Sequence, residues 1–129
     1  MTVRIVRLGT PRARNEGLRI GTVRRPPRGV PKSRFASRDW YDVWFPALAP
    51  SPATLKLGRR ARTGAEWARF MKKYRAEMKS RDADSALELL ARLSRVADFS
   101  VGCYCADEAR CHRSVLRALL VEKGADVGN

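Results

Sequence analysis

The stretch Val101-Gly-Cys-Tyr-Cys-Ala-Asp-Glu-Ala-Arg-Cys-His-Arg113 contains all three cysteines and the single histidine of this 129-residue chain. At its start, residues 99–105 alternate apolar or cysteine side chains with Ser, Gly and Tyr, the period-two pattern of a β-strand, which turns both strand cysteines to one face. Beyond it, apolar residues recur at helical spacing over 115–120, and Gly124 supplies a stop. The sequence therefore predicts a strand, a short turn and a helix that begins near Cys111.

A helix that starts near Cys111 would present unpaired backbone N–H groups and the positive end of its dipole, which favours a bound anion. An anion or nucleotide site would use His112 and Arg113 as donors. A thiol-dependent enzyme would use Cys111 as the nucleophile, because the helix start and nearby cations would lower its pKa. His112 would then act as the base or acid. A metal site would use Cys103, Cys105, Cys111 and His112, which are adequate zinc ligands, although the adjacent pair Cys111 and His112 is awkward to aim at one ion.

The same residues also suit structural roles. Cysteine often packs as a small hydrophobic residue, so Cys103 and Cys105 could belong to the core. A buried His112 could simply bond a backbone carbonyl, and Arg113 could be a solvated charge. These alternatives remain open from the sequence alone.

The net charge of +14 is spread unevenly along the chain. Residues 1–81 hold 21 Lys or Arg against 5 Asp or Glu, whereas residues 82–129 hold 6 against 8. A strongly basic surface favours polyanionic partners, either a phosphorylated small molecule or nucleic acid. A general bias toward arginine in the composition is the alternative explanation of this charge.

Composition places the chain among globular proteins, with 44% hydrophobic residues. No apolar run approaches membrane-spanning length, and the arginine-studded N-terminus lacks an apolar signal segment, so we expect a cytoplasmic protein with no membrane partner. Three crowded cysteines do not form a secreted disulfide framework. The sequence points to no particular cofactor or oligomeric state.

Strands are predicted over residues 2–8 and 18–23. The basic segment 24–34 follows, with too many prolines for regular structure. The aromatic residues within 35–45 are expected to close the core, with base stacking as an alternative. Segment 46–52 is predicted to be a loop.

Two helices are expected before the cysteine-rich stretch. Thr63-Gly-Ala-Glu66 has the form of a capping box, and large apolar residues recur every three or four positions from Trp67 to Met78. The second helix is expected to be capped by Asp82 or Asp84. Its predicted apolar face consists of Leu87, Leu89, Leu90, Leu93 and Val96.

The order of these elements predicts one small α/β domain over residues 1–129, with a largely parallel sheet and helices packed on it. Sites in such folds lie beyond the carboxyl ends of the strands. Residues 105–113 and the basic loop 24–34 are therefore expected to face one cleft.

The span from Leu18 to Leu120 resembles the family called domain of unknown function 488, including its YeaO-like branch. The resemblance rests on the order and spacing of several motifs: Arg24, Pro27-Arg28-Gly29, Trp40, Ala49-Pro-Ser51, the helix from Trp67 to Met78, and the strand before Cys111-His-Arg113.

The resemblance implies a small bacterial α/β protein. It also implies that Arg24, Arg28, Cys111, His112 and Arg113 are site residues. YeaO-like members usually have an acidic residue before the arginine that matches Arg24 and an apolar residue and Trp after it. This chain has Val23 before Arg24, with Arg25 and Pro26 after it, so a role for that acid is not carried over.

Overall fold

The computed structural model describes residues 1–128. Five parallel strands form one sheet in the order β3-β2-β4-β1-β5, with four α-helices packed on it. The strands are β1 (Val3–Arg7), β2 (Leu18–Gly21), β3 (Val43–Trp44), β4 (Phe99–Cys103) and β5 (Val127–Gly128). The α-helices are α1 (Pro52–Arg60), α2 (Gly64–Glu77), α3 (Arg81–Leu93) and α4 (His112–Glu122), and short 3-10 turns are η1 (Lys32–Arg34), η2 (Pro46–Leu48) and η3 (Glu108–Arg110).

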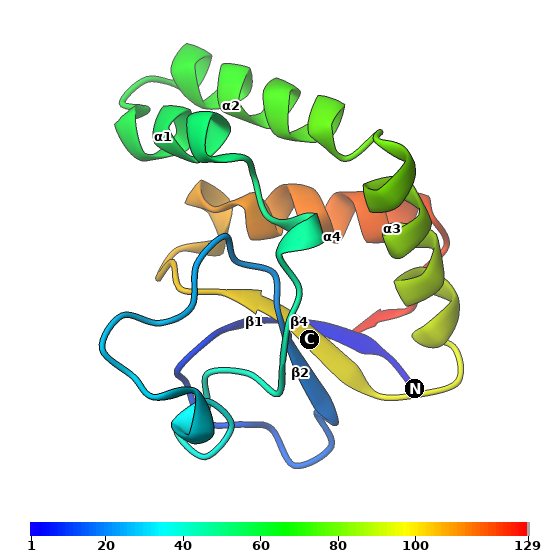
Figure 1. Cartoon of the computed structure of the whole chain (residues 1–129). Coiled ribbons are helices and arrows are strands. Elements are labelled where there is room, and N and C mark those ends of the chain that lie inside the picture. The colour runs from blue at the N-terminus through cyan, green and yellow to red at the C-terminus, as the bar shows by residue number, and fades with distance from the viewer. Residues whose placement is uncertain (129) are drawn as a thin grey trace.

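Strand β4 is the centre of the sheet, because it pairs with β1 on one side and β2 on the other. All five of its residues are buried, as expected of a central parallel strand covered on both faces. Figure 1 shows α1, α2 and α4 on one side of the sheet, with α3 at one end of it. The predicted α/β fold with a parallel sheet is confirmed, and every strand pairing is parallel.

Helix α2 begins as the sequence predicts. The Thr63 hydroxyl accepts a hydrogen bond from the Glu66 N–H at 3.1 Å, and the Glu66 carboxylate accepts one from the Thr63 N–H at 3.0 Å. Phe70, Tyr74 and Met78 are buried along the predicted stripe. The Tyr74 hydroxyl also donates to the Leu48 carbonyl at 2.6 Å, which ties α2 to η2.

Replacing Thr63 with Ala should destabilise the protein by about 1 kcal/mol, because it removes the side-chain acceptor from an N-cap. Thermal unfolding followed by circular dichroism measures this loss of stability. Thr63→Ser retains the hydroxyl and is the matched control. Equal melting temperatures for the Ala and Ser variants would show that the capping box does not stabilise the fold.

The structure differs from the sequence-based expectations in four respects, two of them elements that were not predicted. Helix α1 follows the predicted loop 46–52 at a place where the sequence predicted no element; Ser51 caps it and Pro52 occupies its first turn. Strands β3 and β5 have only two residues each and show no periodicity. Ser80, not Asp82 or Asp84, caps α3, with the two aspartates in its first turn. The side chains expected in the core but exposed are Trp44, Leu89 and Val96.

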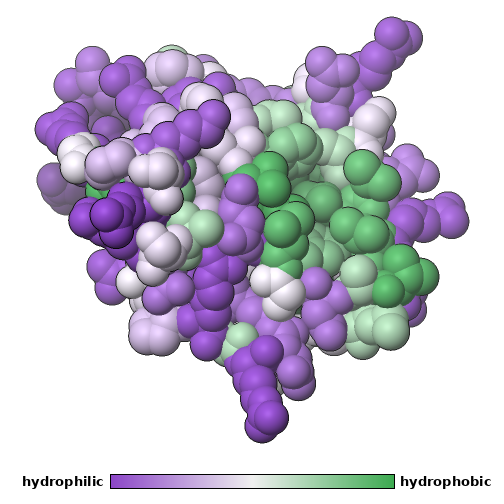
Figure 2. All heavy atoms as spheres, turned by 60° about the horizontal axis from the view of Figure 1, so that its bottom comes forward, coloured by the Kyte–Doolittle hydropathy of each residue, from purple (hydrophilic) through white to green (hydrophobic). Residues whose placement is uncertain are grey.

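Apolar side chains gather on part of the face shown in Figure 2, while hydrophilic side chains and side chains of intermediate hydropathy cover most of the rest of that view. Among residues 1–128, every helix is too short or too polar to cross a bilayer.

Candidate functional site

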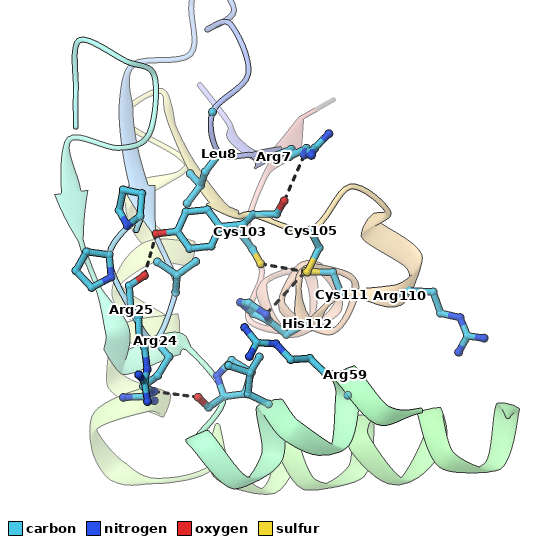
Figure 3. A pocket seen from close by; sticks show the side chains of 18 of the residues that line it. Arg7, Leu8, Arg24, Arg25, Arg59, Cys103, Cys105, Arg110, Cys111 and His112 are labelled. Carbon is cyan, nitrogen blue, oxygen red and sulfur yellow. Dashed lines mark hydrogen bonds between the residues drawn. The ribbon is translucent and has the colours of Figure 1, made fainter. Parts of the chain in front are cut away.

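A cleft of about 1090 Å³ opens at the carboxyl end of the sheet. Its walls come from the segments that follow β1, β2 and β4, from the start of α4, and from α1 and α2. The basic loop after β2 and the stretch from Cys103 to His112 both line it, so the two segments that the sequence placed at one cleft do meet (Figure 3). The parallel topology explains this, because the carboxyl ends of parallel strands share one edge.

The cleft is strongly cationic. In the part of the chain that the structure describes, its lining contains seven cationic side chains and no carboxylate. Figure 3 shows Arg59 pointing from α1 into the cleft. The cationic residues are Arg7, Arg24, Arg25, Arg28, Lys56, Arg59 and Arg110. Glu77 lies near Arg24 but does not line the cleft, so these charges sum to a positive field that attracts anions.

Aromatic rings line the same cleft. Trp40 lies edge-on to Tyr104, with ring centroids 5.7 Å apart, and Trp67 stacks on Phe70 at 4.7 Å. The guanidinium of Arg110 lies 5.6 Å from the centroid of the Trp67 ring. Trp40, Trp67 and Tyr104 are only partly buried.

Cys103, Cys105, Cys111 and His112, called here the thiol cluster, meet on the buried side of the cleft (Figure 3). The Sγ atoms of Cys103 and Cys105 are 3.6 Å apart, and Cys111 Sγ lies 3.8 Å from His112 Nδ1. Cys105 is exposed, whereas the other three residues are buried. All three cysteines are free thiols.

The thiols of the cluster shift one another's pKa. Hydrogen bonds from Cys103 and then Cys111 lower the pKa of Cys105 well below its usual value. The bonds that Cys103 makes to Cys105 and Cys111, together with burial, raise the pKa of Cys103. For Cys111, a bond from Cys103 lowers the pKa, but the bond to Cys105 and burial outweigh it. The lowered pKa expected at Cys111 is therefore found at Cys105.

His112 is neutral in this environment. Burial lowers the pKa of His112 to about 4. A hydrogen bond to the Thr22 carbonyl acts in the opposite direction, but its effect is smaller. Its Nε2 lies 2.8 Å from that carbonyl oxygen. A carbonyl can only accept, so Nε2 carries the proton and Nδ1 keeps a lone pair directed to the thiols.

The three arginines expected to bind a ligand occupy different positions. Arg28 is exposed at the cleft. Arg24 lines the cleft and also donates to the carbonyls of Pro50 and Ala49, at 3.0 Å each. Arg113 is buried and does not line the cleft; it donates to the Cys105 carbonyl at 2.5 Å. Arg113 thus holds the turn after β4 in place.

Sequence reasoning missed the contribution of α1 and of several distant cations. Lys56 and Arg59 line the cleft from α1, and Arg7 lines it from the end of β1. The pair Ser51-Pro52 could have predicted α1, since a serine N-cap followed by proline is a frequent helix start. The sequence around Arg7 does not indicate a place at the site, because only the pairing of β1 with β4 brings this residue to the carboxyl edge of the sheet.

Fold and site together define a small α/β protein with a cationic cleft at the carboxyl end of a parallel sheet and a thiol cluster beside it. The chain belongs to the family of domain of unknown function 488: a family model described as the active DUF488-N3 subclade matches residues 3–124. This confirms the resemblance noted from the sequence. No curated protein and no solved structure matches the chain.

Proposed function

We propose that this protein binds a phosphate-bearing ligand in the cationic cleft, and that a short run of single-stranded nucleic acid is the occupant. The observation that carries the proposal is the lining of seven cationic side chains without a carboxylate among the described residues. Phosphates are the common biological anions that such a concentration of arginine recognises, through paired N–H donors.

Size and charge favour a strand over a single nucleotide. The cleft volume of about 1090 Å³ slightly exceeds the usual range of about 300–1,000 Å³ for sites that hold one small molecule. Seven cations also exceed the charge of one mononucleotide, whereas successive phosphates along a strand would each meet a cation.

The partly buried rings support the same ligand. Proteins that bind single strands combine a positive groove with aromatic side chains on which bases stack. Trp40, Trp67 and Tyr104 supply such rings beside the arginines. The thiol cluster lies against this cleft and would be next to the bound ligand.

Fluorescence anisotropy with a labelled single-stranded oligonucleotide tests the proposal. We expect saturable binding, displaced by unlabelled oligonucleotide and much more weakly by a mononucleotide or inorganic phosphate. Displacement by the mononucleotide at equal concentration would assign the cleft to a phosphorylated small molecule. Absence of binding of the labelled oligonucleotide at low salt would contradict the proposed function.

A further inference from the structure

Three donor atoms of the thiol cluster lie close enough together to share one metal ion. One ligand atom each from Cys103, Cys111 and His112 lies within 4.8 Å of the others, and all three residues are buried. Cys105 Sγ, 3.6 Å from Cys103 Sγ, adds a fourth donor at the cleft side.

The spacing fits a tetrahedral zinc site. With Zn–S bonds of about 2.3 Å and Zn–N bonds of about 2.0 Å, a tetrahedron has ligand-to-ligand edges of about 3.5–3.8 Å. The Cys103–Cys105 separation is 3.6 Å and the Cys111–His112 separation is 3.8 Å. These are two of the six edges of the tetrahedron. The donor atoms of Cys103, Cys111 and His112 lie within 4.8 Å of one another, so the longer edges among them would shorten by up to about 1 Å around a bound ion.

His112 is prepared for coordination. Its Nε2–H donates to the Thr22 carbonyl at 2.8 Å, which directs the lone pair of Nδ1 toward Cys111 Sγ. Histidines that bind metals usually donate their other ring N–H to a carbonyl or carboxylate, which fixes the tautomer and ring orientation.

The backbone at the start of α4 explains how two adjacent residues can bind one ion. Cys111 is the N-cap, with the extended dihedrals φ −135° and ψ 154°, and His112 is the first helical residue. This change of conformation between neighbours brings both side chains to one side. The adjacency of Cys111 and His112, which the sequence suggested would be awkward for binding one ion, is therefore no obstacle in this turn.

We propose that Cys103, Cys105, Cys111 and His112 bind one Zn²⁺ ion. Three sulfur donors and one imidazole select zinc among the common divalent ions, whereas magnesium and calcium prefer oxygen. The ion would join the end of β4 to the start of α4 and so stabilise one wall of the cleft. This site uses none of the seven cationic side chains, so metal binding and ligand binding can be tested separately.

Elemental mass spectrometry of protein purified under reducing conditions without chelator is the first test. We expect about one zinc per chain in the wild type, as for a four-ligand structural site. Cys105→Ser should weaken zinc binding by more than about 100-fold, since even the loss of groups behind the ligands costs up to that much. Cys105 is exposed, so this substitution leaves the core intact.

X-ray absorption at the zinc edge and uptake of Co²⁺ by metal-depleted protein are the second test, and neither depends on a variant. We expect three sulfur neighbours at about 2.3 Å and one nitrogen at about 2.0 Å, and a thiolate-to-cobalt absorption band. The control Arg25→Ala/Arg28→Ala/Arg59→Ala, which alters only exposed cleft arginines, should retain its zinc. Wild-type protein that holds no zinc and takes up no Co²⁺, or an absorption spectrum with only oxygen and nitrogen neighbours, would overturn the proposal.

Discussion

The Glu16→Ala variant is expected to lose about 3–5 kcal/mol of its free energy of unfolding, because removing one partner of a buried ion pair leaves the other charge uncompensated. The Arg19 side chain is 1% exposed and that of Glu16 is 2% exposed. Arg19 Nε and Nη2 donate to the Glu16 carboxylate at 2.6 Å and 2.9 Å. The Ser100 hydroxyl donates to the same carboxylate at 2.8 Å, which ties the pair to β4.

The pair should also make stability depend on pH. Burial raises the pKa of Glu16, but hydrogen bonds from Arg19 and Ser100 outweigh it, so the net pKa is lowered. A carboxyl group whose pKa is lower in the folded state stabilises the fold fully above its unfolded pKa of about 4.3. This contribution is lost as the pH falls through the folded pKa.

Urea unfolding followed by tryptophan fluorescence measures the effect of Glu16→Ala. The matched control is Glu122→Ala, which removes the acid of the exposed ion pair with Arg75. Exposed ion pairs contribute little to the free energy of unfolding, so the control should leave the unfolding midpoint almost unchanged. If Glu16→Ala shifts the midpoint no further than Glu122→Ala, the buried pair does not support the sheet as described.

The triple variant Arg25→Ala/Arg28→Ala/Arg59→Ala should bind a single-stranded oligonucleotide about 100-fold more weakly than the wild type, because each lost arginine removes a charge-assisted bond to phosphate. All three side chains are exposed and line the cleft, so their loss should leave the fold intact. Anisotropy titrations at one fixed salt concentration measure the change.

The control Arg69→Ala/Lys72→Ala/Lys73→Ala removes the same charge from the exposed face of α2, outside the cleft. It should lower affinity only slightly, through the long-range field. Equal losses for the two triple variants would show that the basic surface as a whole, and not the cleft, attracts the ligand.

The parts of the fold that the sequence predicted are those with strong local signals. The capping box at Thr63 and the stripe to Met78 report on a helix whatever its neighbours are, and they predicted α2 closely. β3 and β5 have two residues each and exist only because a neighbouring strand pairs with them. Such pairing leaves no local pattern to read.

The buried pair of Glu16 and Arg19 was also beyond a reading of the sequence. Glu16 lies between the first two predicted strands, in a segment rich in charge and glycine that is typical of an exposed loop. Arg19 lies within the predicted strand over 18–23, where a charged side chain is expected to face solvent. Arg19 is fully buried because carbonyls of Thr10 and Asp39 accept from it, in addition to Glu16. Those partners come from separate loops, so only the tertiary structure shows that the charge is compensated.

The candidate site was predicted in outline. Parallel topology was enough to bring loop 24–34 and residues 105–113 to one cleft. The roles of individual residues were harder to assign, since Arg113 points into the protein and Arg59 enters the cleft from an unpredicted helix. The direction of a side chain at a helix start depends on the N-cap conformation, which could not be predicted from the sequence.

The salt dependence of oligonucleotide binding tests the central claim most directly. Each phosphate neutralised by a cation releases counterions, so the logarithm of the affinity should fall linearly with the logarithm of salt concentration, by about 0.7 per contact for a single strand. If the cleft arginines make these contacts, the triple variant at 25, 28 and 59 should show a slope lower by about 2. Binding of the wild type that does not respond to salt, or an unchanged slope in that variant, would contradict the account.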